Sequence, residues 1–220
     1  MEFNLIFRRI VLLGTPFVVA TDIIFLHPTL GNNIRTEFFP VADFWLALHV
    51  VQLVLFGLMG MTVYLLIDGV AGIAATISRL AVAVYVVFYN AGDTVAGIAT
   101  GILARGAVHL STEKQAAVED AIVKLFLDPV TQHIFVVGAC AWSLALLAAA
   151  VALYRSGAPR LPLIPLALAG LPFIDIFGFV HSPPFNPLAL ALFVLPTIWL
   201  EFTWRKRATA ESSANRLGVS

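Results

Sequence analysis

The chain has 220 residues, of which 60% are hydrophobic and only 12% are charged, and its 13 basic and 13 acidic residues give a formal net charge of zero. Soluble domains contain about one quarter charged residues, so this composition excludes an ordinary soluble protein, and the neutral balance gives no indication of nucleic-acid binding. The apolar residues form long runs, and about 20 such residues cross a bilayer as a helix. We therefore predict an all-α integral membrane protein, with six transmembrane helices forming a single domain over residues 1–207.

The apolar runs place these six helices at about residues 8–27, 43–67, 79–104, 129–154, 161–181 and 187–205. The first helix ends at His27-Pro28. The fourth begins at Asp128-Pro129, where a helix-capping residue precedes a proline at the first helical position. Residues 208–220 are mostly small and polar, which predicts a disordered cytoplasmic tail.

The longest connection lies between the third and fourth helices. It contains the capping-box pattern Thr112-Glu-Lys-Gln115, followed by apolar residues at helical spacing opposite charged ones. This pattern predicts a short external amphipathic helix. Such a helix lies along the membrane surface in our first interpretation, and it covers the bundle as a lid in the alternative.

Basic residues in the connections indicate the orientation, because Lys and Arg favour the cytoplasmic side. Six crossings put both termini on one side, and that side carries Arg8, Arg9, Arg79, Arg155, Arg160, Arg205, Lys206 and Arg207. The sequence therefore predicts a multi-pass protein of the plasma (inner) membrane with cytoplasmic termini. Trp45 fits an anchor at the outer interface, and Asp68 and Glu201 are expected to meet basic residues or head groups near the inner ends.

Asp93 is the most unusual residue, because it lies near the middle of an apolar run. A charged side chain at the bilayer centre costs roughly 2.5–3.5 kcal/mol on insertion scales, so such a residue usually faces a packed interior or a wet cavity. Asn90, Asp93, Gly97 and Gly101 share one helical face, and glycines four residues apart let another helix approach closely. A protonated Asp93 bonded to a neighbouring helix is the purely structural alternative.

The second helix carries His49 and Gln52, which are three residues apart and share a face. In the predicted orientation all five histidines lie outside the membrane or in its outer half. We expect the histidine-bearing helix to pack against the glycines beside Asp93. This arrangement predicts a pocket that faces outward, with Asp93 as its deepest acid.

The predicted site residues fall into three groups: the catalytic candidates are Asp93 and Asp22, the metal-binding candidates are His49, His133, Asp175, His181 and His27, and the other pocket residues are Asn90 and Gln52. Imidazole and carboxylate groups from separate helices bind transition metals, and they also relay protons. Zinc is favoured over haem, for which only His49 and His133 suggest an axial pair. Asp22 and His27 are about 140° apart on an ideal helix, so they converge only if the helix unwinds at Pro28.

Three functions fit this pattern. The first is a metal-dependent membrane enzyme that acts on a lipid or small molecule from the outer leaflet, with Asp93 as general base. The second is a small proton-coupled transporter in which Asp93 and Asp22 titrate, although the candidate polar residues stop in the outer half. The third is an accessory or scaffold subunit that binds another membrane protein or another copy of itself. No nucleotide-binding loop, nucleophile elbow or Cys-x-x-Cys motif is present.

Overall fold

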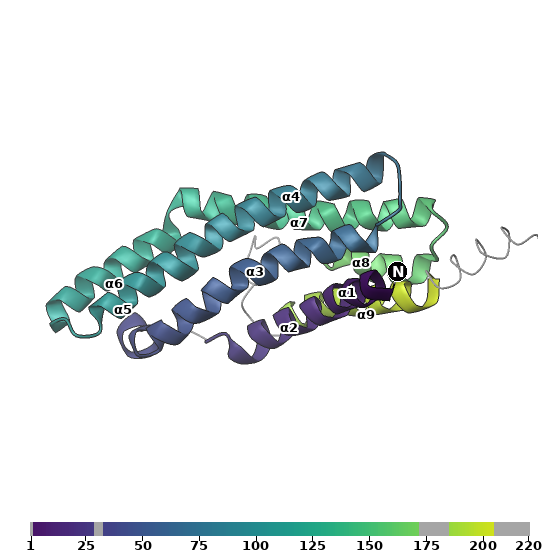
Figure 1. Cartoon of the computed structure of the whole chain (residues 1–220). Helices are drawn as coiled ribbons and strands as arrows, with labels where there is room; N and C mark the ends of the chain where they lie inside the picture. The colour runs from purple at the N-terminus through teal and green to yellow at the C-terminus, as the bar shows by residue number, and fades with distance from the viewer. Residues whose placement is uncertain (1, 29–32, 172–184, 205–220) are drawn as a thin grey trace, which may run out of the picture.

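The computed structural model describes residues 2–28, 33–171 and 185–204, and this part of the chain is all-helical. Its helices run mainly along the long axis of an elongated bundle (Figure 1). The first half of the chain forms α1 (Glu2–Arg9), η1 (Ile10–Gly14), α2 (Thr15–Thr21), η2 (Asp22–Leu26), η3 (Ile34–Phe38), η4 (Phe39–Val41) and α3 (Ala42–Leu66). The remainder forms α4 (Ile73–Asp93), η5 (Thr94–Ala99), α5 (Thr100–Ala107), α6 (Thr112–Leu127), α7 (Pro129–Arg155), α8 (Arg160–Leu168), α9 (Phe185–Trp199) and η7 (Leu200–Trp204).

Three continuous helices in the described ranges are long and apolar enough to cross a membrane, which indicates a membrane protein. They cover Ile34–Leu66, Ile73–Ala107 and Pro129–Arg155, and a shorter apolar helix covers Leu188–Trp204. Each long helix contains one predicted span, apart from a single residue at the end of the first span: the spans are 43–67, 79–104 and 129–154, in the same order. The predicted span 161–181 is described only as far as residue 171. The count of six crossings and the position of the termini relative to a membrane stay predictions.

Small side chains bring α4 and α7 into close contact (Figure 1). The Ser78 hydroxyl donates a hydrogen bond of 2.9 Å to the carbonyl of Ala145. At Gly138 an added Cβ would lie 2.9 Å from the backbone nitrogen of Tyr89, so only glycine permits this approach. Such contacts between small residues are the usual way in which helices associate in a membrane, where no hydrophobic force drives them together.

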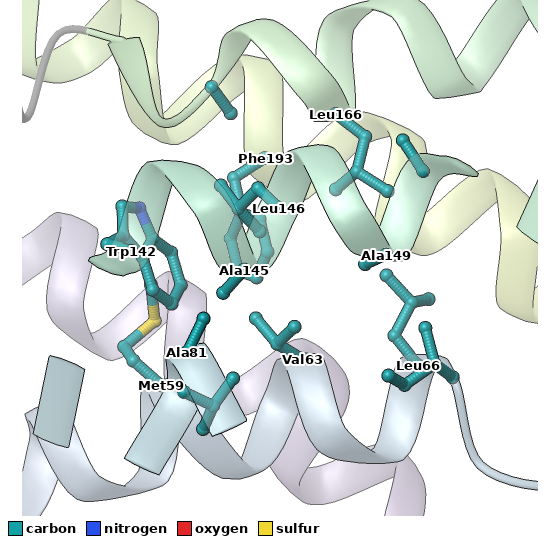
Figure 2. Close-up of a cluster of buried hydrophobic side chains, with 14 of the residues drawn as sticks. Met59, Val63, Leu66, Ala81, Trp142, Ala145, Leu146, Ala149, Leu166 and Phe193 are labelled. Carbon is teal, nitrogen blue, oxygen red and sulfur yellow. The ribbon is translucent and has the colours of Figure 1, made fainter. Parts of the chain in front are cut away.

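The apolar half of the bundle contains the largest buried cluster, whose residues come mainly from α2, α3, α4, α7, α8, α9 and the adjoining π-helical segments η1 and η7 (Figure 2). The labelled side chains are Met59, Val63 and Leu66 of α3, Ala81 of α4, Trp142, Ala145, Leu146 and Ala149 of α7, Leu166 of α8, and Phe193 of α9. Trp142 contacts Phe193 with ring centroids 5.4 Å apart. We call this cluster the apolar core.

A buried ion pair joins the two ends of the described chain. The guanidinium of Arg8 donates from Nη2 to Oε2 of Glu201 at 3.0 Å and from Nε to both carboxylate oxygens. A second acid, Asp68, lies 3.7 Å from Nη1 of Arg8. The expectation that Glu201 and Asp68 meet basic residues is therefore confirmed.

The helix from Ile73 to Ala107 has 35 residues and is about 52 Å long at 1.5 Å per residue, against roughly 30 Å for the hydrocarbon layer of a bilayer. Its last part, α5, forms an antiparallel hairpin with α6 at one end of the bundle (Figure 1). Ile122 of α6 is fully buried in a second apolar cluster with Phe38 and Ala104. Part of the apolar face of α6 is thus covered by protein, and the membrane-surface and lid interpretations both stay predictions.

Candidate functional site

Four polar side chains from three helices are buried where η2, α3 and the end of α4 meet. They are Asp22, His49, Gln52 and Asp93, and each is less than 8% exposed. The Gln52 amide donates a hydrogen bond of 2.7 Å to Oδ2 of Asp22, and Nε2 of His49 lies 3.8 Å from Oδ1 of Asp93. His49 and Gln52 are less than one turn apart on α3, so the two pairs adjoin. We call these four residues the polar cluster.

The close approach of α3 to η5 depends on Gly97. A Cβ at this position would lie 2.0 Å from Cδ2 of His49, which no side chain could occupy. The predicted role of this glycine, to admit a histidine-bearing helix, is confirmed. The same backbone also fixes its neighbour, because the Trp45 indole donates a hydrogen bond of 2.9 Å to the Gly97 carbonyl.

The proton position on His49 follows from its contacts. Nδ1 lies 2.8 Å from the carbonyl oxygen of Trp45, and a carbonyl only accepts hydrogen bonds, so Nδ1 carries a hydrogen. Nε2 is then the atom that gains or loses a proton, and it faces the Asp93 carboxyl. The 3.8 Å separation is longer than a direct hydrogen bond.

His27 joins the edge of this cluster. The helix ends at Leu26 and His27 has an extended backbone, with φ −68° and ψ 119°. Its ring lies 5.3 Å from the ring of His49 and 4.9 Å from that of Trp45. The predicted end of the first helix at His27-Pro28 is therefore confirmed, and the extended backbone brings a second imidazole to the site.

Both acids of the polar cluster lie where an α-helix changes to a π-helix. Asp22 is the first residue of η2, and Asp93 immediately precedes η5. A π-helical turn contains an extra residue, interrupts the regular hydrogen-bond ladder, and is frequent at functional sites. The two changes of geometry therefore coincide with the two acids that the sequence selected as catalytic candidates.

Two buried oxygen atoms have no hydrogen-bond partner among the described residues. They are Oδ2 of Asp93 and Oδ1 of Asn90, one turn apart on α4. A buried acceptor without a donor costs about 1–3 kcal/mol, so such atoms call for an explanation wherever they occur. Here both belong to residues beside the polar cluster, which leaves the site with free accepting capacity.

An apolar groove of about 440 Å³ runs between α2–η2 and α3. Its lining consists of Phe17, Val18, Thr21, Asp22, Leu26, Phe44, Ala47, Leu48, Val51 and Leu55. The volume lies within the range of small-molecule sites, which is about 300–1,000 Å³. Asp22 belongs both to this groove and to the polar cluster, so the two adjoin at that residue.

The predicted metal ligands are not brought together in the described ranges, where no three His, Cys, Asp or Glu side chains form a group suited to a metal. His133 is exposed on α7, and its Nδ1 contacts the carbonyl of Pro129 in the same helix. Asp175 and His181 lie outside the described residues. The expectation of zinc or haem therefore gains no support from the part of the chain that the structure describes.

Trp45 is the site residue that the sequence reasoning missed. We expected an anchor at the membrane interface, but the side chain is 5% exposed and its ring centroid lies 4.3 Å from that of His49. The signal was present, because Trp45, His49 and Gln52 follow each other at spacings of four and three residues and so share one helical face.

Comparison of the chain with known protein families, curated proteins and solved structures finds no match. The function must therefore be argued from the site itself, since a fold alone does not imply an activity.

Proposed function

We propose that this protein is a multi-pass protein of the plasma (inner) membrane, with six crossings and both termini in the cytoplasm. The three long apolar helices support this topology, as does the ion pair between Arg8 and Glu201, which puts the ends of the first and last helices side by side. The basic residues of the connections favour the cytoplasm for that end.

A cysteine scan tests the topology. In a Cys140→Ala background, a membrane-impermeant maleimide should label Ser111→Cys on intact cells, because residue 111 lies in the connection predicted to be external. Ser156→Cys should react only after the cells are lysed. Labelling of both positions, or the reverse pattern, would contradict six crossings with cytoplasmic termini.

Within this topology, we infer that His49 and Asp93 form an acid–base centre that acts on a lipid or other small molecule from the bilayer. The observation that carries this proposal is the contact between Nδ1 of His49 and the Trp45 carbonyl, because it directs the titrating Nε2 atom to Asp93. The pair exchanges one proton: a neutral His49 faces a protonated carboxyl, or an imidazolium faces a carboxylate. General acid–base catalysis needs such a group within reach of the substrate.

Neighbouring residues have positioning roles in this mechanism. Gln52 holds Asp22 through one carboxylate oxygen, and Trp45 holds His49 through its backbone carbonyl and the Gly97 carbonyl through its indole. The groove beside Asp22 admits an apolar chain from the bilayer. The reacting group then lies in a buried site, where electrostatic interactions are stronger than in water.

Spectroscopy of the full chain in detergent tests the proton exchange without a known substrate. We expect the ¹⁵N resonances of His49 to show a hydrogen on Nδ1, and the infrared carboxyl band of Asp93 to change over the same pH interval as these resonances. Asp93→Asn should alter the His49 titration, and the control His133→Gln on the exposed face of α7 should not. A His49 titration that is unchanged in Asp93→Asn would refute the centre.

Proton-coupled transport is the second candidate, and the change to π-helix at both acids favours it, because transporters often bind ions at discontinuous helices. Beyond the polar cluster the bundle is filled by the apolar core, so a path through the described residues would need a rearrangement. Uptake in proteoliposomes that is driven by a pH gradient, and lost in Asp93→Asn, would support transport over acid–base catalysis.

Metal analysis of purified protein tests the remaining hypothesis, a metal-dependent enzyme. Stoichiometric zinc or haem that disappears in His49→Ala with His133→Ala would restore it. The accessory or scaffold role predicts instead that a second membrane protein, or a second copy, copurifies in a stable ratio.

A further inference from the structure

The polar cluster and its surroundings have more hydrogen-bond acceptors than donors. Oδ2 of Asp93 and Oδ1 of Asn90 have no donor among the described residues, while the Gln52 amide is directed to Asp22. The side chain of Asp93 is nine-tenths buried, so bulk water does not satisfy it. A ligand that fits this site must therefore bring donors.

The charge of the site also favours a ligand that brings hydrogen-bond donors. Two carboxylates, Asp22 and Asp93, are buried near each other, and no Lys or Arg in the described ranges pairs with either of them. Two basic residues of neighbouring helices are engaged elsewhere: Arg35 binds Glu119, and Arg79 donates to the carbonyls of Ile67 and Val70 just after α3. An anionic head group such as a phosphate or a carboxylate would be repelled.

The groove supplies the second half of the specificity. It is lined by apolar side chains apart from Thr21 and Asp22, and several of its walls, such as Phe17 and Phe44, also belong to the exposed apolar surface. In a membrane protein such a surface faces acyl chains, so an apolar chain enters the groove from the bilayer at little cost. Asp22 stands where the groove meets the polar cluster.

We propose that the site recognises a single-chain amphiphile with a primary ammonium head group. The ammonium lies between Asp22 and Asp93, it directs its N–H donors to these carboxylates and to Oδ1 of Asn90, and its apolar chain occupies the groove between α2–η2 and α3. This inference rests on the proposed acid–base centre and names the ligand class of that same site. A primary ammonium has three donors, which a quaternary ammonium lacks.

Binding of radiolabelled dodecylamine tests the inference. The full chain is reconstituted in phosphatidylcholine nanodiscs, and empty nanodiscs correct for partition into lipid. We expect saturable binding of about one amine per chain. Dodecanol and dodecyltrimethylammonium should compete at least about tenfold more weakly, since each lacks either the charge or the donors, and a charged hydrogen bond accounts for a factor of that order.

Variants locate the binding site. Asp22→Asn and Asp93→Asn should each weaken dodecylamine binding by at least about tenfold, whereas Asp43→Asn, the same change at an exposed position at the start of α3, should leave it unchanged. Ala47→Phe fills the groove and should weaken the binding of dodecylamine and of dodecanol alike. If one aspartate variant fails to fold, the other aspartate variant and Ala47→Phe still test whether the amine binds at this site.

Each remaining outcome contradicts the inference. Equal competition by dodecanol would indicate a hydroxyl lipid, equal competition by dodecyltrimethylammonium would show that N–H donors are not needed, and the absence of saturable binding would exclude this ligand class. The spectroscopic test of His49 and Asp93 is independent. If His49 and Asp93 titrate together but no amine binds, the proposed ligand class is refuted and the proposed acid–base centre is not.

Discussion

The two halves of the bundle both use glycine and other small residues to bring helices together, but for different purposes. In the apolar half, Gly138 of α7 lets the backbone of α4 approach at Tyr89. In the polar half, Gly97 makes room for the imidazole of His49. The same kind of residue therefore serves packing in one half and gives a titratable ring its place in the other.

The halves also differ in the kind of buried polar atom that lacks a hydrogen-bond partner among the described residues: guanidinium nitrogens of Arg8 and Arg9 at the end of the apolar half, and oxygens in the polar half. The hydroxyls of Thr62, Ser78 and Thr197 in the apolar half all donate to backbone carbonyls. In the polar half, Asn90 and Asp93 keep buried oxygens without a donor among the described residues. Natural proteins tolerate such a cost mainly at functional sites.

The largest effect is expected for Glu201→Ala, at the end of the apolar half. It leaves the guanidinium of Arg8 buried with only the more distant Asp68, and removal of one partner of a buried pair costs about 3–5 kcal/mol. Chemical unfolding in detergent measures the change. Asp120→Asn breaks the exposed pair with Lys124 and should cost about 0–1 kcal/mol. Equal losses in both variants would show that burial of the Arg8 pair is unimportant.

Gly97→Ala comes next and acts on the polar half. The added methyl overlaps the His49 ring, so α3 and η5 must separate at a cost of about 1–3 kcal/mol, and the Trp45 bond to the Gly97 carbonyl should weaken. Unfolding and the intrinsic fluorescence of Trp45 report the two changes. Gly57→Ala on α3 meets open space and should stabilise the helix by up to about 1 kcal/mol. A neutral Gly97→Ala would contradict the close approach.

A gain in stability is expected for Asn90→Leu. The change removes a buried oxygen without a donor and should raise the free energy of unfolding by about 1 kcal/mol, while it weakens ligand binding. Measurements of the free energy of unfolding and of dodecylamine binding on the same variant test both expectations. A loss of stability would mean that Asn90 has a structural partner.

The smallest effect is expected for Ser78→Ala in the apolar half. It removes the hydrogen bond to the Ala145 carbonyl and should cost about 0.6 kcal/mol, the average for such bonds between membrane helices. The sign is opposite to that of Asn90→Leu, so the two variants together measure the contrast between the halves. A stabilising Ser78→Ala would remove that contrast.

The sequence predicted the parts of the structure that depend on local patterns. Apolar runs located α3 and α7 closely, and the face shared by Asp93 and Gly97 correctly anticipated the approach of His49. It did not predict the π-helical segments at Asp22 and Asp93, because they arise from contacts between helices and leave no periodic signal. The prediction that Trp45 is an interfacial anchor was wrong for a related reason. An aromatic residue near a helix end fits a membrane interface as well as a buried site, until the side chains next to it are known.

The metal-site prediction shows the limit of this reasoning. Residue types and depth along a helix indicated which imidazoles and carboxylates lie at one level, but the rotation of each helix decides which of them meet. His49 and Asp93 face each other, whereas His133 is turned outward. A single sequence contains little information about that rotation for helices that are apolar on every side, since neither face is marked by polarity.

The ion pair between Arg8 and Glu201 also constrains how the protein is made. The two residues are 193 positions apart, so at about 5–20 residues per second the ribosome reaches Glu201 some 10–40 s after it passes Arg8. Until then Arg8 is without its main partner, and Asp68, the other acid near it among the described residues, is made only 60 residues after Arg8. The contact between Arg8 and Glu201 therefore forms only after both ends of the described chain have been made.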